Sequence, residues 1–158
     1  MSLTTDVITP WRAGSLLTAY NVAFAAAALP QLDTAFGIQP AETLLAEPTV
    51  TKLPVMAAFV TERRRVDYFT RQNLSIRVVV RVRLAIGSSD PIAIHDVAGT
   101  YCDCVRAVAT TTFGETLALF RWLADDMVGF IYNPAEHTPT QTVTSDFEFV
   151  VPRLGTTV

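Results

Sequence analysis

Between Leu74 and Ile86 the chain reads LSIRVVVRVRLAI, a pattern of strict alternation. Apolar residues occupy every second position, and arginine occupies three of the six positions between them. A period of two in which β-branched residues predominate is typical of a strand with one face in the core and the other polar. These 13 residues span about 43 Å when extended, which exceeds the common strand length. We therefore expect a long strand that carries a row of guanidinium groups.

The stretches around this strand predict further parts of a sheet. Leu53–Val60 reads as a strand with a proline near its start, where the missing N–H matters least. The polar stretch Glu62–Phe69 is interpreted either as the arm of a hairpin or as an exposed loop. Val143–Val151 carries phenylalanine at alternate positions, which predicts a terminal strand that ends at Pro152.

Three other stretches have the spacing of helices. Trp11–Leu29 is rich in alanine and lies between a proline that can open a helix and another that ends it. A second helix is expected to begin at Asp90, an N-cap residue before Pro91, and to end at Thr110–Thr112. Glu115–Val128 allows a further short helix with its apolar residues on one side.

The remaining stretches complete a single domain over residues 1–158. Residues 1–9 are expected to form an N-terminal arm, residues 31–51 a connecting stretch at the surface, and residues 153–158 a C-terminal tail. Phe130–Tyr132 predicts a short strand. We therefore predict an α+β fold with one mostly antiparallel sheet of about four strands, packed with two to four helices.

The composition has few charges for a chain of this size. Half of the residues are hydrophobic, the mean hydropathy is +0.33 and charged residues make up 17% of the chain, against about 25% in an average protein. One explanation is a large core beneath a threonine-rich surface. The other is a surface buried against further subunits, because obligate interfaces resemble a core cut in half. The composition leaves both explanations open.

The charges are unevenly distributed along the chain. Seven arginines and one acidic residue lie between Arg63 and Arg83, whereas three arginines and nine acidic residues lie between Leu84 and the end. The net charge of −3 is not that of a typical nucleic-acid-binding protein. A basic segment beside an acidic remainder favours pairing between copies of the chain.

The sequence carries no common catalytic or phosphate-binding motif. Its seven glycines are scattered and match neither a dinucleotide-binding fingerprint nor a P-loop nor a nucleophile elbow. We therefore expect no enzyme activity, no catalytic residue and no cofactor. The alanine-rich segment Val22–Leu29 is far too short to span a bilayer, and no signal peptide is evident, so we expect a soluble protein without a membrane partner.

A metal site is the other chemistry that we considered. His95, Cys102 and Cys104 would be its ligands, but on a helix the two cysteines diverge by about 200°, which prevents them from sharing an ion. We expect no metal and interpret both thiols as reduced and structural. Asp125 and Asp126 are adjacent in sequence and are interpreted as a solvated helix end rather than a catalytic pair.

The arginines are the one unusual feature, and three interpretations stay open. They can lie on a solvated sheet face that deters edge pairing, pair with carboxylates of a neighbouring subunit, or line a channel through which nucleic acid passes. We expect one group at an interface or on a lumen-facing loop, namely Arg63, Arg64 and Arg65. We expect a second group on the exposed sheet face, namely Arg77, Arg81 and Arg83.

From Leu53 to Pro152 the pattern resembles the tail terminator family of long-tailed bacteriophages. The likeness consists of a proline-containing strand that leads through an arginine-rich stretch to the alternating strand, a helix that carries Tyr101 and Asp103, and the late aromatic strand Asp146–Val151. The alanine-rich helix at Trp11–Leu29 fits a leading helix.

The resemblance implies a structural virion protein without catalysis. It implies a homohexameric ring that caps the tail tube and joins it to the head, with the tail tube protein and a head-completion or neck protein as partners and DNA passing through the lumen. Such a protein is assembled in the host cytoplasm and resides in the tail or neck of the virion. A closed ring follows from a head-to-tail interface whose rotation closes.

Three alternatives accompany this expectation. Another neck, tail-completion or tail tube component belongs to the same structural class. A small α+β enzyme or ligand-binding domain would need a pocket, for which the candidate residues are Tyr68, His95, Asp96 and Tyr101. A nucleic-acid module would use the arginine strand.

Overall fold

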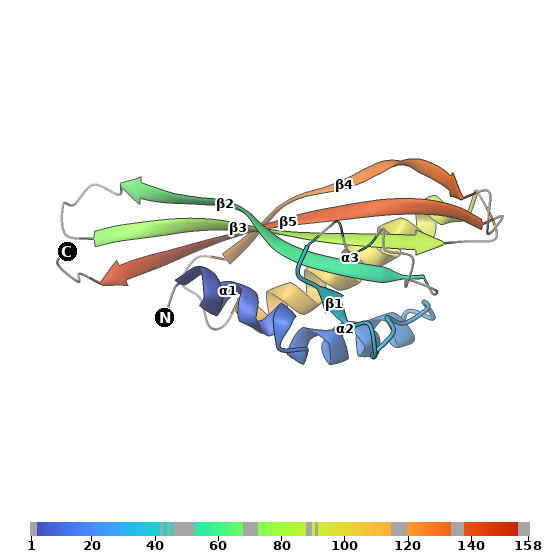
Figure 1. The fold of residues 1–158 in the computed structure, drawn as a ribbon, viewed down its shortest axis with the longest axis horizontal. Helices are drawn as coiled ribbons and strands as arrows, with labels where there is room; N and C mark the ends of the chain where they lie inside the picture. Colours follow the sequence, from blue (N-terminus) through green and yellow to red (C-terminus); the bar gives the residue numbers. More distant parts are fainter. Residues whose placement is uncertain are drawn as a thin grey trace.

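Alternating and helical stretches of the sequence build a sheet with helices packed on one of its faces (Figure 1). A computed structural model describes residues 3–41, 43, 45, 53–67, 73–87, 90, 92–114, 120–133 and 138–154. The elements of this part of the chain are, in order, α1 (Leu3–Arg12), α2 (Ser15–Ala26), β1 (Ile38–Gln39), β2 (Val55–Asp67), β3 (Asn73–Gly87), α3 (Ile94–Phe113), β4 (Phe120–Asn133) and β5 (Thr138–Leu154).

The strands form one sheet in the order β1-β2-β3-β5-β4. The four long strands are antiparallel to their neighbours, whereas β1 is parallel to β2 and pairs with Met56 and Ala57 alone. The α+β class is confirmed. The described sheet has five strands and is mixed, because part of the expected connecting stretch at 31–51 forms β1.

The sheet is longer than the helices that cover it. The 17 residues of β5 span about 56 Å when extended, and the 20 residues of α3 span about 30 Å. Figure 1 shows β2, β3 and β5 continuing past the helices at one end of the molecule.

Both predicted strands around the arginines are confirmed. β3 runs from Asn73 to Gly87, and its even-numbered residues from Ile76 to Ile86 are buried. β2 continues beyond Val60 to Asp67, so the polar stretch that begins at Glu62 is a hairpin arm as far as it is described. The terminal strand is also confirmed, but it does not end at Pro152. A proline is tolerated there because β4 pairs with β5 only as far as Phe149, which leaves one edge of β5 without a described partner.

The predicted arm and the helix start at Pro10 were wrong, whereas the helix expected over 11–29 is present in part as α2. Residues 3–12 of the expected arm and helix form α1, and a separate helix, α2, begins at Ser15. The break lies at Gly14, whose φ of +80° is the left-handed conformation that favours glycine. Pro10 lies near the end of α1 rather than at a helix start. The overlooked signal was the helical spacing of Val7, Ile8 and Trp11, all of which are buried.

The predicted helix at Glu115–Val128 was also wrong, since the described residues from Phe120 onward form strand β4, which includes the short strand expected at 130–132. An irregularity in the pairing between Trp122 and Ala124 leaves Leu123 as an extra residue, and a bulge of this kind interrupts the period-two pattern by which a strand is recognised. Residues 115–119 and 155–158 of the predicted helix and tail lie outside the described residues, whereas 153–154 belong to β5.

The start of α3 also differs from the prediction. The helix begins at Ile94 rather than at Asp90. The Asp90 carboxylate accepts a hydrogen bond from the backbone N–H of Ile92 at 2.9 Å, which forms a turn before the helix. Pro91, the expected first helical residue, lies outside the described residues.

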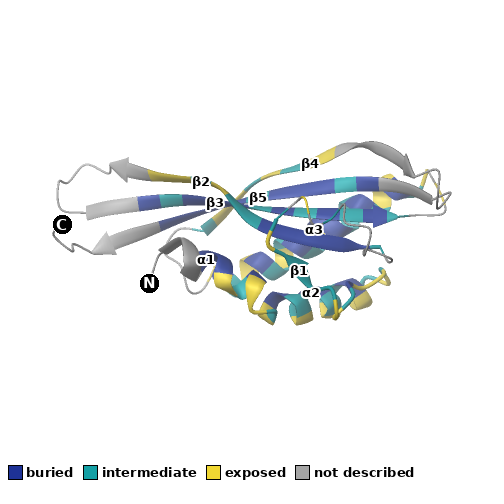
Figure 2. Ribbon diagram, in the orientation of Figure 1, coloured by how far each residue is buried: buried dark blue, intermediate teal, exposed yellow. Residues whose placement is uncertain are grey.

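A single core lies between the helices and one face of the sheet. The Trp11 ring of α1 stacks on Phe113 of α3, with ring centroids 4.9 Å apart, and meets Phe149 of β5 edge-on at 6.0 Å. The Trp11 indole N–H also donates to the buried Tyr20 hydroxyl at 3.1 Å. Figure 2 shows buried residues along the middle of β3 and β5 and on the sides of the helices that face them.

Candidate functional site: the open face of the sheet

The helix-free face of the sheet, called the open face below, carries most of the charged residues singled out in the sequence. Residues of β3 alternate between the two faces of the sheet. The core residues of this strand lie on one face, so Arg77, Arg81 and Arg83 lie on the other. The prediction that one face of this strand is core and the other carries guanidinium groups is confirmed. All three described helices contribute to the core on the other face.

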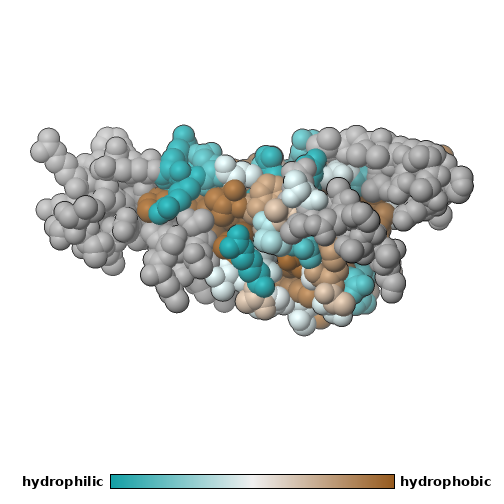
Figure 3. Space-filling model, viewed as in Figure 1, coloured by the Kyte–Doolittle hydropathy of each residue, from teal (hydrophilic) through white to brown (hydrophobic). Residues whose placement is uncertain are grey.

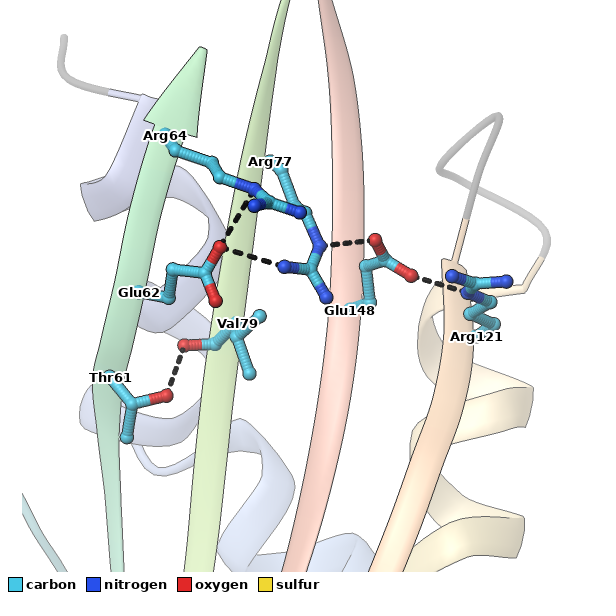
Figure 4. A network of polar contacts seen from close by, with 7 residues as sticks. All are labelled: Thr61, Glu62, Arg64, Arg77, Val79, Arg121 and Glu148. Carbon is cyan, nitrogen blue, oxygen red and sulfur yellow. Dashed lines mark hydrogen bonds and ion pairs between the residues drawn. The ribbon is translucent and has the colours of Figure 1, made fainter. Parts of the chain in front are cut away.

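A row of five alternating charges crosses the four long strands on the open face (Figure 4). The Glu62 carboxylate of β2 accepts from Arg64 at 2.9 Å and from Arg77 of β3 at 2.7 Å. Arg77 also donates to Glu148 of β5, which accepts a further hydrogen bond from Arg121 of β4. We call these residues the charge row. Each carboxylate in it binds two guanidinium groups.

Glu148 is the most enclosed member of the charge row. Its side chain is 7% exposed, whereas that of Arg121 is 71% exposed. Burial alone raises the pKa of a carboxyl group, but hydrogen bonds from Arg121 and Arg77 outweigh it and hold the pKa of Glu148 below its usual range. Glu148 is therefore ionised at neutral pH and ties β3, β5 and β4 together.

A second ion pair lies further along the same face. Both carboxylate oxygens of Asp146 accept from Arg81, at 2.8 and 2.9 Å, in the two-pronged geometry that guanidinium groups favour. A hollow of about 250 Å³ adjoins the pair. The residues that line it are Arg81, Arg83, Ala124, Asp126, Thr144 and Asp146. Its lining is mostly charged, unlike the apolar pockets that bind small ligands.

The open face also holds apolar residues that lie outside the helix-covered core. Val55, Ala57, Val79 and Val150 are each at most 7% exposed, yet none belongs to the core cluster. The methylene groups of long arginine side chains commonly cover apolar surface of this kind. In the space-filling view, apolar residues lie among hydrophilic ones across the middle of the molecule (Figure 3).

The arginines from 63 to 65 lie within β2 rather than in a loop. Arg63 and Arg64 are exposed, and the register places them opposite Val78 and Arg77, so they occupy opposite faces of the sheet. Arg65 is paired with Ile76 in the register. Their predicted role at an interface or in a lumen stays a prediction.

The acids of the open face were missed in the sequence. Asp146 and Glu148 alternate with Phe147 and Phe149, and that alternation alone places both acids on the face opposite the aromatic rings. Among the described side chains the open face holds five arginines and four acids, a net charge of +1, with the acids at Glu62, Asp126, Asp146 and Glu148. Because its arginines are accompanied by acids, this face is a poor partner for a nucleic-acid backbone.

Asp125 and Asp126 lie on β4 and not at a helix end. Asp126 lines the hollow on the open face. Asp125 lies on the opposite face, where it accepts hydrogen bonds from Ser145 at 2.6 Å and from the Trp122 indole at 2.9 Å. Arg106 of α3 lies over the Trp122 ring at 5.0 Å. These contacts join α3 to the edge strand.

The two cysteines are free and separated as predicted. Cys102 is buried, and burial together with the nearby Asp125 carboxylate raises the pKa of its thiol to about 12. The Cys104 thiol lies on the other side of the helix, 3.8 Å from the Ala23 carbonyl of α2. Within the described ranges, no three His, Cys, Asp or Glu residues are grouped so as to hold a metal ion.

The residues proposed for a ligand pocket have separate surroundings. Tyr101 is buried in the core and donates its hydroxyl to the Pro30 carbonyl at 2.7 Å. His95 and Asp96 are exposed on the first turn of α3, and Tyr68 lies outside the described residues. No helix among the described residues has the length and apolar character needed to cross a membrane.

Comparison with known proteins adds no family to this description. No model of a protein family matches the chain, and no curated protein sequence is significantly similar to it.

Proposed function

We propose that this protein is a structural virion subunit that assembles into a ring, with the role of a tail terminator that caps the tail tube and joins it to the head or neck. The observation that carries the proposal is the sheet. Its long strands continue past the helices, and all three described helices pack on one of its two faces (Figure 1). An antiparallel sheet often keeps one polar face in water, so the support for assembly comes from the part of the strands that continues past the helices, where no described helix covers either face (Figure 1).

Two further observations support this proposal. The elements behind the resemblance to tail terminators are present as β2, β3, α3 and β5, in that order along the chain. The charged fraction of 17% is low, as is expected for a chain that hides surface against copies of itself. The partners proposed are the tail tube protein and a head-completion or neck protein, and DNA passes through the ring without sequence-specific contact.

Three interpretations of the arginines were left open by the sequence. Within one chain Arg77 and Arg81 bind carboxylates of neighbouring strands, so they connect the strands of the sheet. The exposed Arg63 and Arg64 of β2 remain candidates for contacts between copies.

Mass in solution tests this function. We expect the purified protein to form a discrete particle of several subunits by light scattering coupled to size exclusion, and closed rings by negative-stain electron microscopy. Long tubes would instead indicate a tail tube component, and a monomer at high concentration would refute ring formation. A gel-shift assay with double-stranded DNA at 150 mM salt tests the alternative of a nucleic-acid module, which tight binding would favour.

A further inference from the structure

Both long edges of the described sheet lack a strand partner. β4 pairs with β5 on one side, and no described strand lies along its other side. β1 covers β2 at Met56 and Ala57, which leaves the outer edge of β2 without a described strand from Ala58 to Asp67. The N–H and C=O groups of such edges tend to pair with another strand. Arg64 of β2 and Asp126 of β4, one on each of these edge strands, are both exposed.

The strand directions fit these two edges to each other. Because β2, β3, β5 and β4 are antiparallel in succession, β4 runs opposite to β2. If two copies stand side by side in the same orientation, β4 of one copy lies antiparallel to β2 of the next. The alternation of directions then continues across the contact without interruption. Repetition of such a head-to-tail contact closes into a ring when its rotation allows.

The charges of the two edges distinguish this contact from the two symmetric contacts, β4 with β4 and β2 with β2. The described side chains of the β4 edge include Arg121, Asp125 and Asp126, a net charge of −1, whereas those of the β2 edge include Glu62, Arg63 and Arg64, a net charge of +1. A two-fold contact between two β4 edges would bring the acids together, and one between two β2 edges would bring the arginines together. Like charges directly opposite each other destabilise a strand pair, and opposite charges stabilise it. The pairing of β4 with β2 is therefore favoured over either symmetric contact.

The faces of the sheet and the bulges restrict the register. The pairing on β2 is irregular between Val60 and Glu62, and that on β4 is irregular on either side of Ala124–Val128. The longest regular segments without a described partner on their outer side are thus Glu62–Asp67 and Ala124–Val128. Arg64 and Asp126 both belong to the open face, as their registers with Arg77 and Thr144 show. Placing them opposite each other keeps the two open faces continuous. It also displaces the next copy along the strands by about 20 Å, because within one sheet Asp126 is level with Ala57 and not with Arg64. A closed ring with this register therefore needs strands that are tilted to its axis.

We propose that the ring subunits join through an antiparallel pairing of Ala124–Val128 of one copy with Glu62–Val66 of the next, with Asp126 opposite Arg64. This inference rests on the proposed ring and specifies its interface. The Arg64 side chain already pairs with Glu62 at 2.9 Å and is 62% exposed, so it reaches Asp126 of the neighbouring copy from an exposed position. The contact joins the two sheets into one.

Cysteine crosslinking tests this pairing. In the proposed register Ala124 lies opposite Val66, so A124C combined with V66C should give a ladder of dimers, trimers and larger species on mild oxidation. Within one chain β2 and β4 are separated by β3 and β5, a distance of about 14 Å, which excludes an internal disulfide between them. A124C combined with R64C or E62C tests the neighbouring registers on the same face, and both pairs should react more slowly.

The controls separate failure of the interface from failure of the proposed function. Wild type and V66C alone should give no ladder, and a covalent dimer of A124C alone would indicate a symmetric β4 contact and overturn the proposal. If light scattering shows assembled particles under reducing conditions and none of the three double variants forms a ladder, the ring stands and this interface is wrong. A wild-type protein that is monomeric overturns both. A variant that fails to assemble when reduced is replaced by D126C with R64C, the next pair in the same register.

Discussion

The two faces of β3 bury their residues by different means. On the helix-covered face, Val78 and Val80 are inaccessible because apolar side chains of the helices pack against them. On the open face, Arg77 is 16% exposed and Glu148 of the adjacent strand 7% exposed, although all described helices pack on the other side. Both side chains are held instead in ion pairs, Arg77 with Glu62 and Glu148, and Glu148 also with Arg121. One face is therefore held by packing and the other by paired charge.

The largest loss of stability is expected from a substitution in the core on the helix-covered face. Trp11→Ala removes a fully buried ring that contacts Phe113 and Phe149 and donates to Tyr20. It should lower the free energy of unfolding by about 3–5 kcal/mol, because the loss of a large aromatic leaves a cavity. Denaturant unfolding at a fixed protein concentration measures the change.

Trp122→Ala is the matched control for this substitution. Trp122 is 39% exposed on the edge strand, so its loss should cost about 1 kcal/mol, close to the average for a point substitution. An equal cost for the two tryptophans would contradict the assignment of the core to the helix-covered face.

A substitution in the charge row of the open face should cause the next largest loss of stability. Glu148→Ala leaves the half-buried Arg77 with Glu62 as its remaining described partner, and it removes the partner of Arg121. Because Arg77 keeps one partner, the expected cost is that of lost hydrogen bonds to a charged group, about 1.5–3 kcal/mol. Arg121→Ala should cost less than 1 kcal/mol, because that side chain is 71% exposed and exposed ion pairs contribute little. Chemical denaturation of both variants checks the order of the two effects.

The charged face should also give the protein a specific dependence on pH. The folded pKa of Glu148 lies below its usual value, so its stabilising contribution is present above the unfolded pKa of about 4.3. That contribution is lost as the pH falls through the folded pKa. Unfolding curves between neutral pH and pH 3 should therefore show a steeper loss for wild type than for Glu148→Gln. Parallel curves would show that the charge row does not depend on ionised Glu148.

The contrast between the two faces also explains what the sequence predicts. β3 is recognisable because an apolar residue occupies every even-numbered position from Ile76 to Ile86, and both predicted faces of that strand are present. The extra residue at Leu123 destroys the same period in β4, and a helix was predicted in its place. α1 is a helix of 10 residues with an internal proline, which hides its signal.

The candidate site was half predictable for a similar reason. The arginines are neighbours in sequence and stand out, whereas Arg77 and Glu148 are 71 residues apart, and Arg81 and Asp146 are 65 apart. Their pairing depends on the register between β3 and β5, which no local pattern specifies. The alternation of Asp146 and Glu148 with aromatic residues does predict a shared face for the two acids, but it does not identify the arginines beside them.

The smallest expected effect sharpens the comparison, because it changes the helical layer without touching the sheet. Gly99 lies within α3, and a Cβ placed there meets no atom within 4 Å. Gly99→Ala should therefore raise the free energy of unfolding by about 0.5–1 kcal/mol through helix propensity. Gly14→Ala is the opposite control, because its φ of +80° strains any other residue and should cost about 1 kcal/mol. Thermal and denaturant unfolding measure both changes. The same curves at several pH values compare the loss of stability of Gly99→Ala with that of wild type. A difference between the two would show that the helical layer and the charge row are coupled rather than independent.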